Sequence, residues 1–397
     1  MKGINARLLI AFYFFNMIVF TNGSIISKAG KLVFVGLSFI YIIKYNVTLK
    51  WKSYYAWMVS FLLISGVSIF WAESTSFVIS GINTIALNFL CIFMLTQLFV
   101  KINDWDLVVS KSVLILPSIM FVRLFIQFGT AIFDGLRNIQ NGNHNSAGMY
   151  AAWGVVFGIY YIVRTQSKKI TYKFLILLNL GGCIISMSRK AILYLVLPLV
   201  IIYILMGENV LKRARNIFLL VLAAICGYLA VINIPMLYEY IGKGIESMLR
   251  FFAQGKGDIS AAGRRTRINF GLKHFYQKPW FGWGTMNYNY LFGNYETSTA
   301  MVIADNNFID LLVNVGIIGT VIYYFIYLKT IIMYFSIKSK KTLSVIMPFA
   351  VLLTLLACDY GVSSYLYLYS QTFIAVAVCM MLECYNSECK HNKIALE

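Results

Sequence analysis

The chain has 397 residues, of which 60% are hydrophobic and only 12% are charged, and its formal net charge is +19. A soluble domain of this size would have to bury more apolar surface than its core can hold, so the composition excludes a soluble globule. The apolar runs reach membrane-spanning length and are not short alternating segments, which indicates helices and excludes a membrane barrel. We therefore predict an all-α, polytopic membrane protein.

About twelve apolar segments are long enough to cross a bilayer as helices. They lie near residues 7–20, 29–44, 54–72, 77–100, 107–129, 144–163, 170–188, 190–206, 216–234, 307–329, 342–358 and 361–383. The first run ends in Thr-Asn-Gly-Ser without a small-residue cleavage site, so we interpret it as a transmembrane helix and not as a signal peptide. The predicted organisation is nine spans in residues 1–234, one large loop in 235–306, and three spans with a cytoplasmic tail in 307–397.

The distribution of Lys and Arg predicts the orientation of these spans. With a cytoplasmic N-terminus, twenty Lys and Arg residues fall on the inner connections and five on the short outer ones. This bias agrees with the positive-inside rule, so both termini are predicted to be cytoplasmic and the large loop extracytoplasmic. The loop itself holds eight positive charges. Long loops tolerate such charges, but the rule does not explain why arginines cluster there.

Two amphipathic helices are predicted inside the large loop. Residues 238–252 and 264–276 each place apolar side chains at helical spacing, and in the second helix Ile268, Leu272 and Phe275 share one side. Pro279 is expected to end that helix. The arginines then lie on its first turn, where free backbone N–H groups also favour anions.

Arg264, Arg265 and Arg267 form a tight cluster of cations. A guanidinium binds phosphate oxygens through two hydrogen bonds and cannot lose its charge, so the spacing favours an anion site over a merely solvated loop surface. Aromatic residues follow the cluster and either stack on sugar rings or form an interfacial belt. These are Trp280, Phe281, Trp283, Tyr288 and Tyr290.

Smaller polar features interrupt the apolar part of the chain. Arg123 lies in the fifth span, where an ionisable residue marks either a functional site or a structural partner. His144 and Asn145 open the sixth span, and Ser188 with Arg189 precedes the eighth. On the predicted map, the last two clusters face the same compartment as the large loop.

Several short motifs follow one another between residues 143 and 320. They are Ala-Gly-Arg264; Pro279 followed by Phe281-Gly282-Trp283-Gly284; and Asn306-Asn307-Phe308-Ile309-Asp310-Leu311-Leu312 leading into Gly316 and Gly319. This series resembles the signature of the O-antigen ligase and polymerase superfamily. Ser188-Arg189 and His144-Asn145 resemble two weaker motifs of the same family.

The resemblance implies a multi-pass, GT-C-like glycosyltransferase in a bacterial inner (plasma) membrane, acting at its extracytoplasmic face on undecaprenyl-pyrophosphate-linked oligosaccharides. Polymerases move the growing glycan to the next lipid-linked repeat unit, whereas ligases move it to lipid A core. The family often has His where Asp305 stands, a departure that favours the polymerase over the ligase. A flippase is a third alternative, but intramembrane charge is sparse here. Expected partners are the lipid-linked substrate, the bilayer, a chain-length regulator and a flippase, with no nucleic acid.

The chemistry of such a transfer assigns roles to the polar residues. The enzyme must hold the diphosphate, present an acceptor hydroxyl to the opposite face of the anomeric carbon, and remove one proton, so inversion is expected. We predict that Arg264 holds the diphosphate and that Asp305 accepts the proton. Alternatively, Asp305 only caps the following helix. With no Asp-x-Asp pair outside and no His cluster, no divalent metal or other cofactor is expected.

Further residues are predicted to contact the substrate around this pair. Arg189 is the second choice for the diphosphate, and the other two arginines of the loop support it. The remaining candidates are polar residues near the predicted outer ends of spans and one inside a span. The full set is Arg189, Arg265, Arg267, Asn306, Arg123, His144 and Asn145.

Overall fold

The computed structural model describes residues 2–20, 24–136, 144–207, 209–235, 259–296, 303–338 and 342–394, together with Tyr238, Gly242 and Glu246. These residues are mainly helical and none of them lies in a strand, which confirms the all-α expectation. Among them, eight helices are long and apolar enough to cross a membrane: Ile25–Lys44, Lys52–Phe70, Thr75–Phe99, Trp105–Asp134, His144–Thr165, Leu211–Asn233, Asn307–Ser336 and Leu368–Cys389. Three shorter apolar helices cover Ala6–Val19, Ile170–Ile185 and Leu343–Cys358. The chain is a multi-pass membrane protein.

Each of the twelve predicted spans falls on a helix, although the ends differ. The largest difference concerns the last span, predicted over 361–383, because α17 (Leu368–Ile394) begins seven residues later and ends eleven residues later. Residues 359–367 form an irregular connection with one short 3-10 turn, η4 (Ser364–Leu366). That twelve helices cross the membrane stays a prediction.

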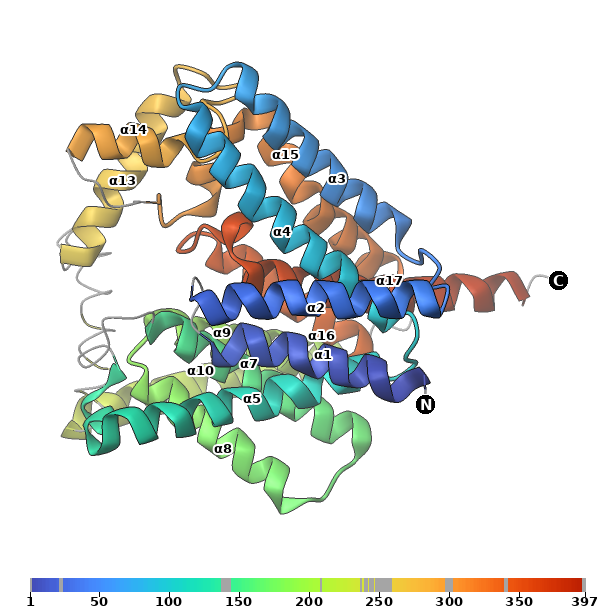
Figure 1. Ribbon diagram of the computed structural model, residues 1–397. Coiled ribbons are helices and arrows are strands. Elements are labelled where there is room, and N and C mark those ends of the chain that lie inside the picture. The colour runs from blue at the N-terminus through green and yellow to red at the C-terminus, as the bar shows by residue number, and fades with distance from the viewer. Residues whose placement is uncertain are drawn as a thin grey trace. The chain divides into compact units, whose positions relative to one another are not determined.

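The helices form two units, the first of which comprises Met1–Thr48, Met94–Leu249 and Ser339–Thr354. It contains α1 (Lys2–Val19), α2 (Ile25–Lys44), α5 (Trp105–Phe128), η2 (Gly129–Asp134), α7 (His144–Thr165), α8 (Ile170–Ile185), α9 (Arg189–Leu205) and α10 (Val210–Asn233). Helix α7 packs against α5, α8 and α9 (Figure 1). Its glycines permit close contact, since a Cβ atom at Gly154 would lie 2.5 Å from Nδ2 of Asn179 on α8. That amide group donates to the Leu114 carbonyl of α5 at 2.8 Å.

The second unit comprises Leu49–Phe93, Arg250–Lys338 and Leu355–Glu397. It contains α3 (Lys52–Val67), η1 (Ser68–Phe70), most of α4 (Thr75–Phe99), α13 (Ile259–Phe275), α14 (Asn287–Glu296), α15 (Asn307–Ser336), the end of α16 (Leu343–Cys358), η4 and α17. Helix α15 packs against α3, α13, α14 and α17 (Figure 1). Trp57 of α3 donates from Nε1 to the carbonyls of Ile322 at 2.9 Å and Tyr323 at 3.0 Å.

The predicted large loop is structured where it is described. Residues 259–296 contain α13 and α14, which both pack on α15, so this part of the loop is held by tertiary contacts. The predicted amphipathic helix over 238–252 lies outside the described residues, apart from Tyr238, Gly242 and Glu246.

Candidate functional site

Two of the sequence motifs, the segment 279–284 and the Gly316–Gly319 segment, are joined by backbone hydrogen bonds at a kink in α15. Gly316 has φ 67° and ψ −169° inside this helix, which interrupts its ladder of hydrogen bonds. The carbonyls of Val313 and Asn314 accept instead from the N–H groups of Trp283 at 2.7 Å and Gly284 at 2.8 Å. On the other side of the kink, the N–H of Ile317 donates to the Pro279 carbonyl at 2.8 Å. The segment 279–284, called the motif loop below, therefore satisfies backbone groups that the kink leaves open.

Glycine is required on both sides of this contact. A Cβ atom at Gly316 would lie 2.3 Å from the Trp280 carbonyl oxygen, and one at Gly282 would lie 2.6 Å from the Val313 carbonyl oxygen. Both residues also have positive φ, which side chains disfavour. The Phe-Gly-Trp-Gly and Gly-x-x-Gly motifs are therefore two halves of one backbone contact.

We expect Gly316→Ala to destabilise the protein by about 3 kcal/mol or more, because the backbone conformation there is open only to glycine and the new methyl group meets a backbone oxygen. Thermal unfolding of the purified protein in detergent measures the effect. Gly66→Ala on α3 is the matched control, since no atom beyond its chain neighbours and the adjoining backbone of α3 lies within 4 Å of its added Cβ. It should be neutral or stabilising by up to ~1 kcal/mol. Equal melting temperatures for the two variants would contradict the role of the kink.

Helix α13 begins earlier than predicted, so the arginines lie further from its N-terminus than expected. The sequence indicated a helix from residue 264 with the arginines on its first turn, but α13 starts at Ile259. Arg264 therefore lies on the second turn. The prediction that free backbone N–H groups of the first turn assist the arginines in binding an anion is wrong. The cationic site depends on the side chains themselves.

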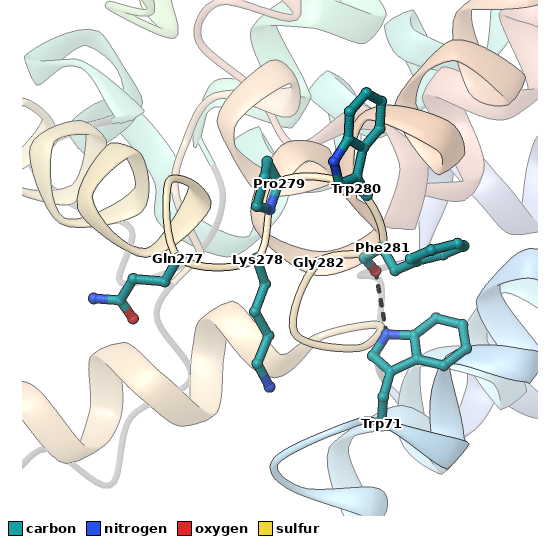
Figure 2. A pocket seen from close by; sticks show the side chains of 7 residues that line it. All are labelled: Trp71, Gln277, Lys278, Pro279, Trp280, Phe281 and Gly282. Carbon is teal, nitrogen blue, oxygen red and sulfur yellow. Dashed lines mark hydrogen bonds between the residues drawn. The ribbon is translucent and has the colours of Figure 1, made fainter.

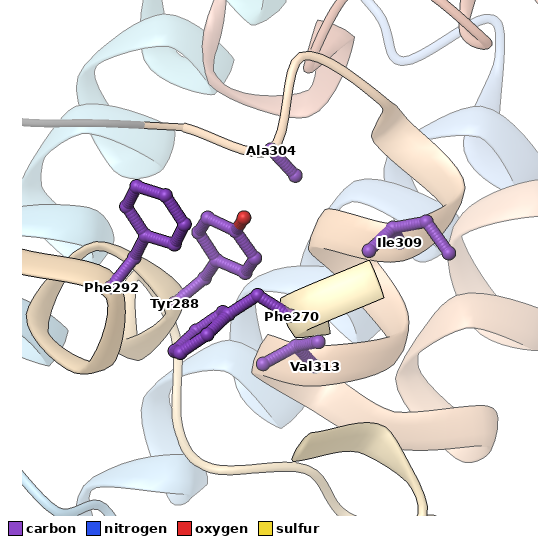
Figure 3. Close-up of a cluster of buried hydrophobic side chains, with 6 residues drawn as sticks. All are labelled: Phe270, Tyr288, Phe292, Ala304, Ile309 and Val313. Atoms are coloured by element: carbon purple, nitrogen blue, oxygen red, sulfur yellow. The ribbon is translucent and has the colours of Figure 1, made fainter. Parts of the chain in front are cut away.

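A small apolar core fixes α13 against α14 and α15. It consists of Phe270, Tyr288, Phe292, Ala304, Ile309 and Val313 (Figure 3). The predicted apolar side of α13 packs against it through Ile268, Leu272 and Phe275. At Gly271 an added Cβ would lie 2.3 Å from Cγ2 of Ile309, so glycine lets α13 approach the first turns of α15 closely. This packing places the arginines of α13 beside the residues that precede α15.

Arg267 and Asp305 form an ion pair in this position. Nη2 of Arg267 lies 2.8 Å from Oδ2 of Asp305, and the two side chains are 23% and 27% exposed. The backbone carbonyl of Arg267 accepts from the Tyr288 hydroxyl at 2.8 Å, which fixes this turn of α13. Partial exposure leaves both groups accessible to a substrate.

Arg264 lies one turn before Arg267 on the same side of α13, and both side chains are half-buried, whereas Arg265 between them is exposed. Arg264 and Arg267 are called the arginine pair below. Their Nε atoms are buried and make no hydrogen bond with the described residues. Two guanidinium groups thus accompany one carboxylate. The excess positive charge of these half-buried side chains suits a phosphate-containing ligand.

Asn306, and not Asp305, caps α15. The Asn306 side chain accepts from the Ile309 N–H at 3.1 Å, which is the geometry of an N-cap. The alternative that Asp305 only caps the helix is therefore wrong. Asp305 has a positive φ of 51°, a conformation that Asp and Asn adopt more readily than most residues. Asn306 is 3% exposed and its side-chain oxygen is already used, so a direct contact with substrate remains only a prediction.

The other predicted site residues belong to the first unit. Ser188 caps α9 by accepting from the Ala191 N–H at 3.3 Å, and its hydroxyl donates to Oδ1 of Asn145 at 2.7 Å. The structure thus brings Asn145 into contact with Ser188, the residue before Arg189, which is the first residue of α9. Arg123 donates from Nη1 to the Val19 carbonyl at 2.7 Å, so it has a structural partner at the end of α1.

The aromatic residues near the motif loop divide into exposed and buried ones. A pocket of about 480 Å³ is lined by Trp71 and residues 277–282, and Trp71 donates from Nε1 to the Phe281 carbonyl at 3.2 Å (Figure 2). Trp280 and Phe281 are 62% and 50% exposed, so they remain able to stack on sugars or to lie in an interfacial belt. Tyr288 is fully buried, which removes it from the sugar-stacking candidates.

The described geometry defines a multi-pass helical membrane protein that holds a half-buried arginine pair and a carboxylate beside a kinked helix. Residues 174–324 match the O-antigen ligase (Wzy_C) family, which confirms the resemblance to the O-antigen ligase and polymerase superfamily. Members of this family are membrane glycosyltransferase-like enzymes that act on lipid-linked glycans. The match includes α13, the motif loop and the first half of α15. None of the curated proteins matches the chain.

Proposed function

We propose that this protein polymerises surface polysaccharide by transferring the growing glycan from undecaprenyl pyrophosphate to the next lipid-linked repeat unit. The observation that carries the proposal is the arginine pair next to Asp305. One guanidinium is ion-paired with the carboxylate, and the other has no ion-pair partner among the described residues. A diphosphate needs such charge-assisted donors, and an acceptor hydroxyl needs a nearby carboxylate.

The proposed reaction forms one bond and breaks one. The acceptor hydroxyl oxygen attacks the anomeric carbon of the donor sugar, and the bond from that carbon to the diphosphate oxygen breaks with inversion. The hydroxyl proton passes to a carboxylate oxygen of Asp305. The leaving undecaprenyl pyrophosphate keeps the bonding electrons, and Arg264 with Arg267 stabilises its negative charge. Asp305 returns its proton to solvent before the next cycle.

The ligase reaction is the second candidate, since the matched family is described as O-antigen ligase. Both reactions use the same donor and differ in the acceptor. Proteoliposomes with purified undecaprenyl-pyrophosphate repeat units separate them. A ladder of longer lipid-linked glycans without any other acceptor supports the polymerase. Product that forms only when lipid A core is added supports the ligase, and no product with either acceptor contradicts both.

We expect residues 235–303 to face the extracytoplasmic side, because the charge bias of the short loops predicts this orientation. Single cysteines at Gly255 and Gly293, in a protein without other cysteines, should react with a membrane-impermeant maleimide in intact cells. The matched control is a variant that keeps only the native Cys389 in the C-terminal region, since this residue is exposed and predicted to be cytoplasmic. It should react only after the membrane is broken. The opposite pattern would exclude the proposed topology.

A further inference from the structure

Two buried side chains hold the beginning of α15 on the connection between α16 and α17. Asn307 and Asp359 are 0% and 1% exposed. The Asn307 N–H donates to the Asp359 backbone carbonyl at 2.7 Å, and its Nδ2 donates to Oδ2 of the same residue at 3.2 Å. Asp359 therefore binds Asn307 through both its backbone and its side chain.

Tyr324, which follows the kink in α15, completes this network. Its hydroxyl donates to Oδ2 of Asp359 at 2.8 Å and accepts from Nδ2 of Asn307 at 2.8 Å. Its ring stacks on Phe308, with 4.9 Å between the ring centroids. The amide oxygen of Asn307 accepts from the Tyr365 N–H at 3.0 Å. All the polar atoms of the Asn307 side chain are thus directed at fixed partners.

The connection 359–367 also lies within the electrostatic reach of the candidate site. Burial raises the pKa of the Asp359 carboxyl to about 7. Burial also raises the pKa of the Tyr367 phenol to about 12, and the negative charges of Asp305 and Asp310 add to this effect. Tyr367 is half-buried on the same connection. The negative charge of Asp305 therefore acts on Tyr367 of the connection.

We propose that Asp359 is a positioning residue of the transferase site, which fixes Asn307 and thereby the place of Asp305 two residues before it. The proposal rests on the function proposed above and extends the site to a part of the chain beyond the family match, which ends at residue 324. An apolar residue would fill this place without the desolvation of a carboxylate. What an apolar residue lacks is an acceptor for both Asn307 Nδ2 and the Tyr324 hydroxyl.

The test compares Asp359→Leu, Asp359→Asn and Tyr324→Phe in proteoliposome polymerisation. In Asp359→Leu, kcat should fall about tenfold to a hundredfold, since a misplacement of about 1 Å has such effects. KM for the lipid-linked repeat unit should stay within about twofold, because the arginine pair on α13 is unchanged. Asp359→Asn keeps an oxygen acceptor and should recover most of kcat. Tyr324→Phe should lose kcat severalfold.

Trp57→Phe is the matched control, since it removes a buried donor to the same helix at Ile322 and Tyr323. It should lower the melting temperature without changing kcat of the folded protein. Hydrogen–deuterium exchange of residues 303–310 gives a readout that needs no activity, and it should speed up in Asp359→Leu but not in Trp57→Phe. Unchanged exchange and kcat in Asp359→Leu would overturn the proposal. If Asp359→Leu does not fold, unchanged kcat in Tyr324→Phe overturns it.

The two readouts separate the two proposals. Wild-type protein that forms no glycan product would contradict the proposed function, while exchange at 303–310 would still decide whether Asp359 fixes this segment. If the wild-type protein is active and folded Asp359→Leu keeps a normal kcat, only the role of Asp359 is contradicted.

Discussion

Polymer formation should fall by about tens to hundreds of fold when Arg264 is replaced by alanine, with the protein still present in the membrane. The guanidinium of Arg264 has a buried Nε without an acceptor among the described residues, whereas Arg267 is already paired with Asp305. Removing one charge-assisted contact to a diphosphate costs about 2–4 kcal/mol in the transition state. Chain length on gels and protein level on immunoblots measure the result.

Arg264→Lys should also lose much of the activity, because an ammonium keeps the charge but not the planar pair of donors. The matched control is Lys273→Ala, which removes a positive charge from an exposed position on the same helix. It should make normal polymer. Full-length polysaccharide from Arg264→Ala at normal protein levels would remove Arg264 from the site.

The helices could be predicted because bilayer thickness sets the length of each apolar run. The start of α13 was missed, although the sequence has Asp258, a residue type common at helix N-caps, followed closely by Ala261 and Ala262. The predicted helix begins only at residue 264, after a glycine-rich break over residues 254–257. Local patterns therefore placed the helix but not its first turns.

The contact between the motif loop and α15 could not be predicted, since it joins residues about thirty positions apart. The glycines of both motifs are visible in the sequence, yet only the structure shows that Gly282 faces the backbone of 313–314 and that Gly316 faces the backbone of 280–281. The family resemblance supplied the motifs without their physical reason. That reason is a kink whose open backbone groups bind the loop.

The buried network around Asp359 was missed for a different reason. Asn307, Asn314 and Asp359 stand in or next to apolar runs, and polar residues in such places mark sites or structural partners. In the sequence, only Arg123 is predicted to be a site or a structural partner on this criterion. Asn314 illustrates what it would have found, since its amide donates to Asp310 at 2.8 Å and accepts from the Tyr288 N–H at 2.7 Å.

Turnover should fall about a hundredfold or more in Asp305→Asn, if Asp305 accepts the proton. This substitution keeps the positive-φ conformation accessible and keeps an oxygen that can accept from Arg267, but it removes the base together with the negative charge of the ion pair. Lipid-linked substrate should still bind, because the arginine pair is intact. Polymerisation rates in liposomes and the equilibrium binding of the repeat unit separate the two effects.

Asp305→His should retain part of the activity, since a neutral imidazole can take the same proton. Its rate should decline as the pH falls below about 6.5, because the protonated imidazole no longer accepts a proton. With the cap assigned to Asn306, the rival role for Asp305 is a hydrogen bond or ion pair that orients Arg267 or the substrate. Asn would serve nearly as well as Asp for a hydrogen bond, whereas an ion pair would lose its negative charge. An Asp305→Asn protein that works at near wild-type rate would therefore support an orienting role through a hydrogen bond, and it would exclude Asp305 as the base.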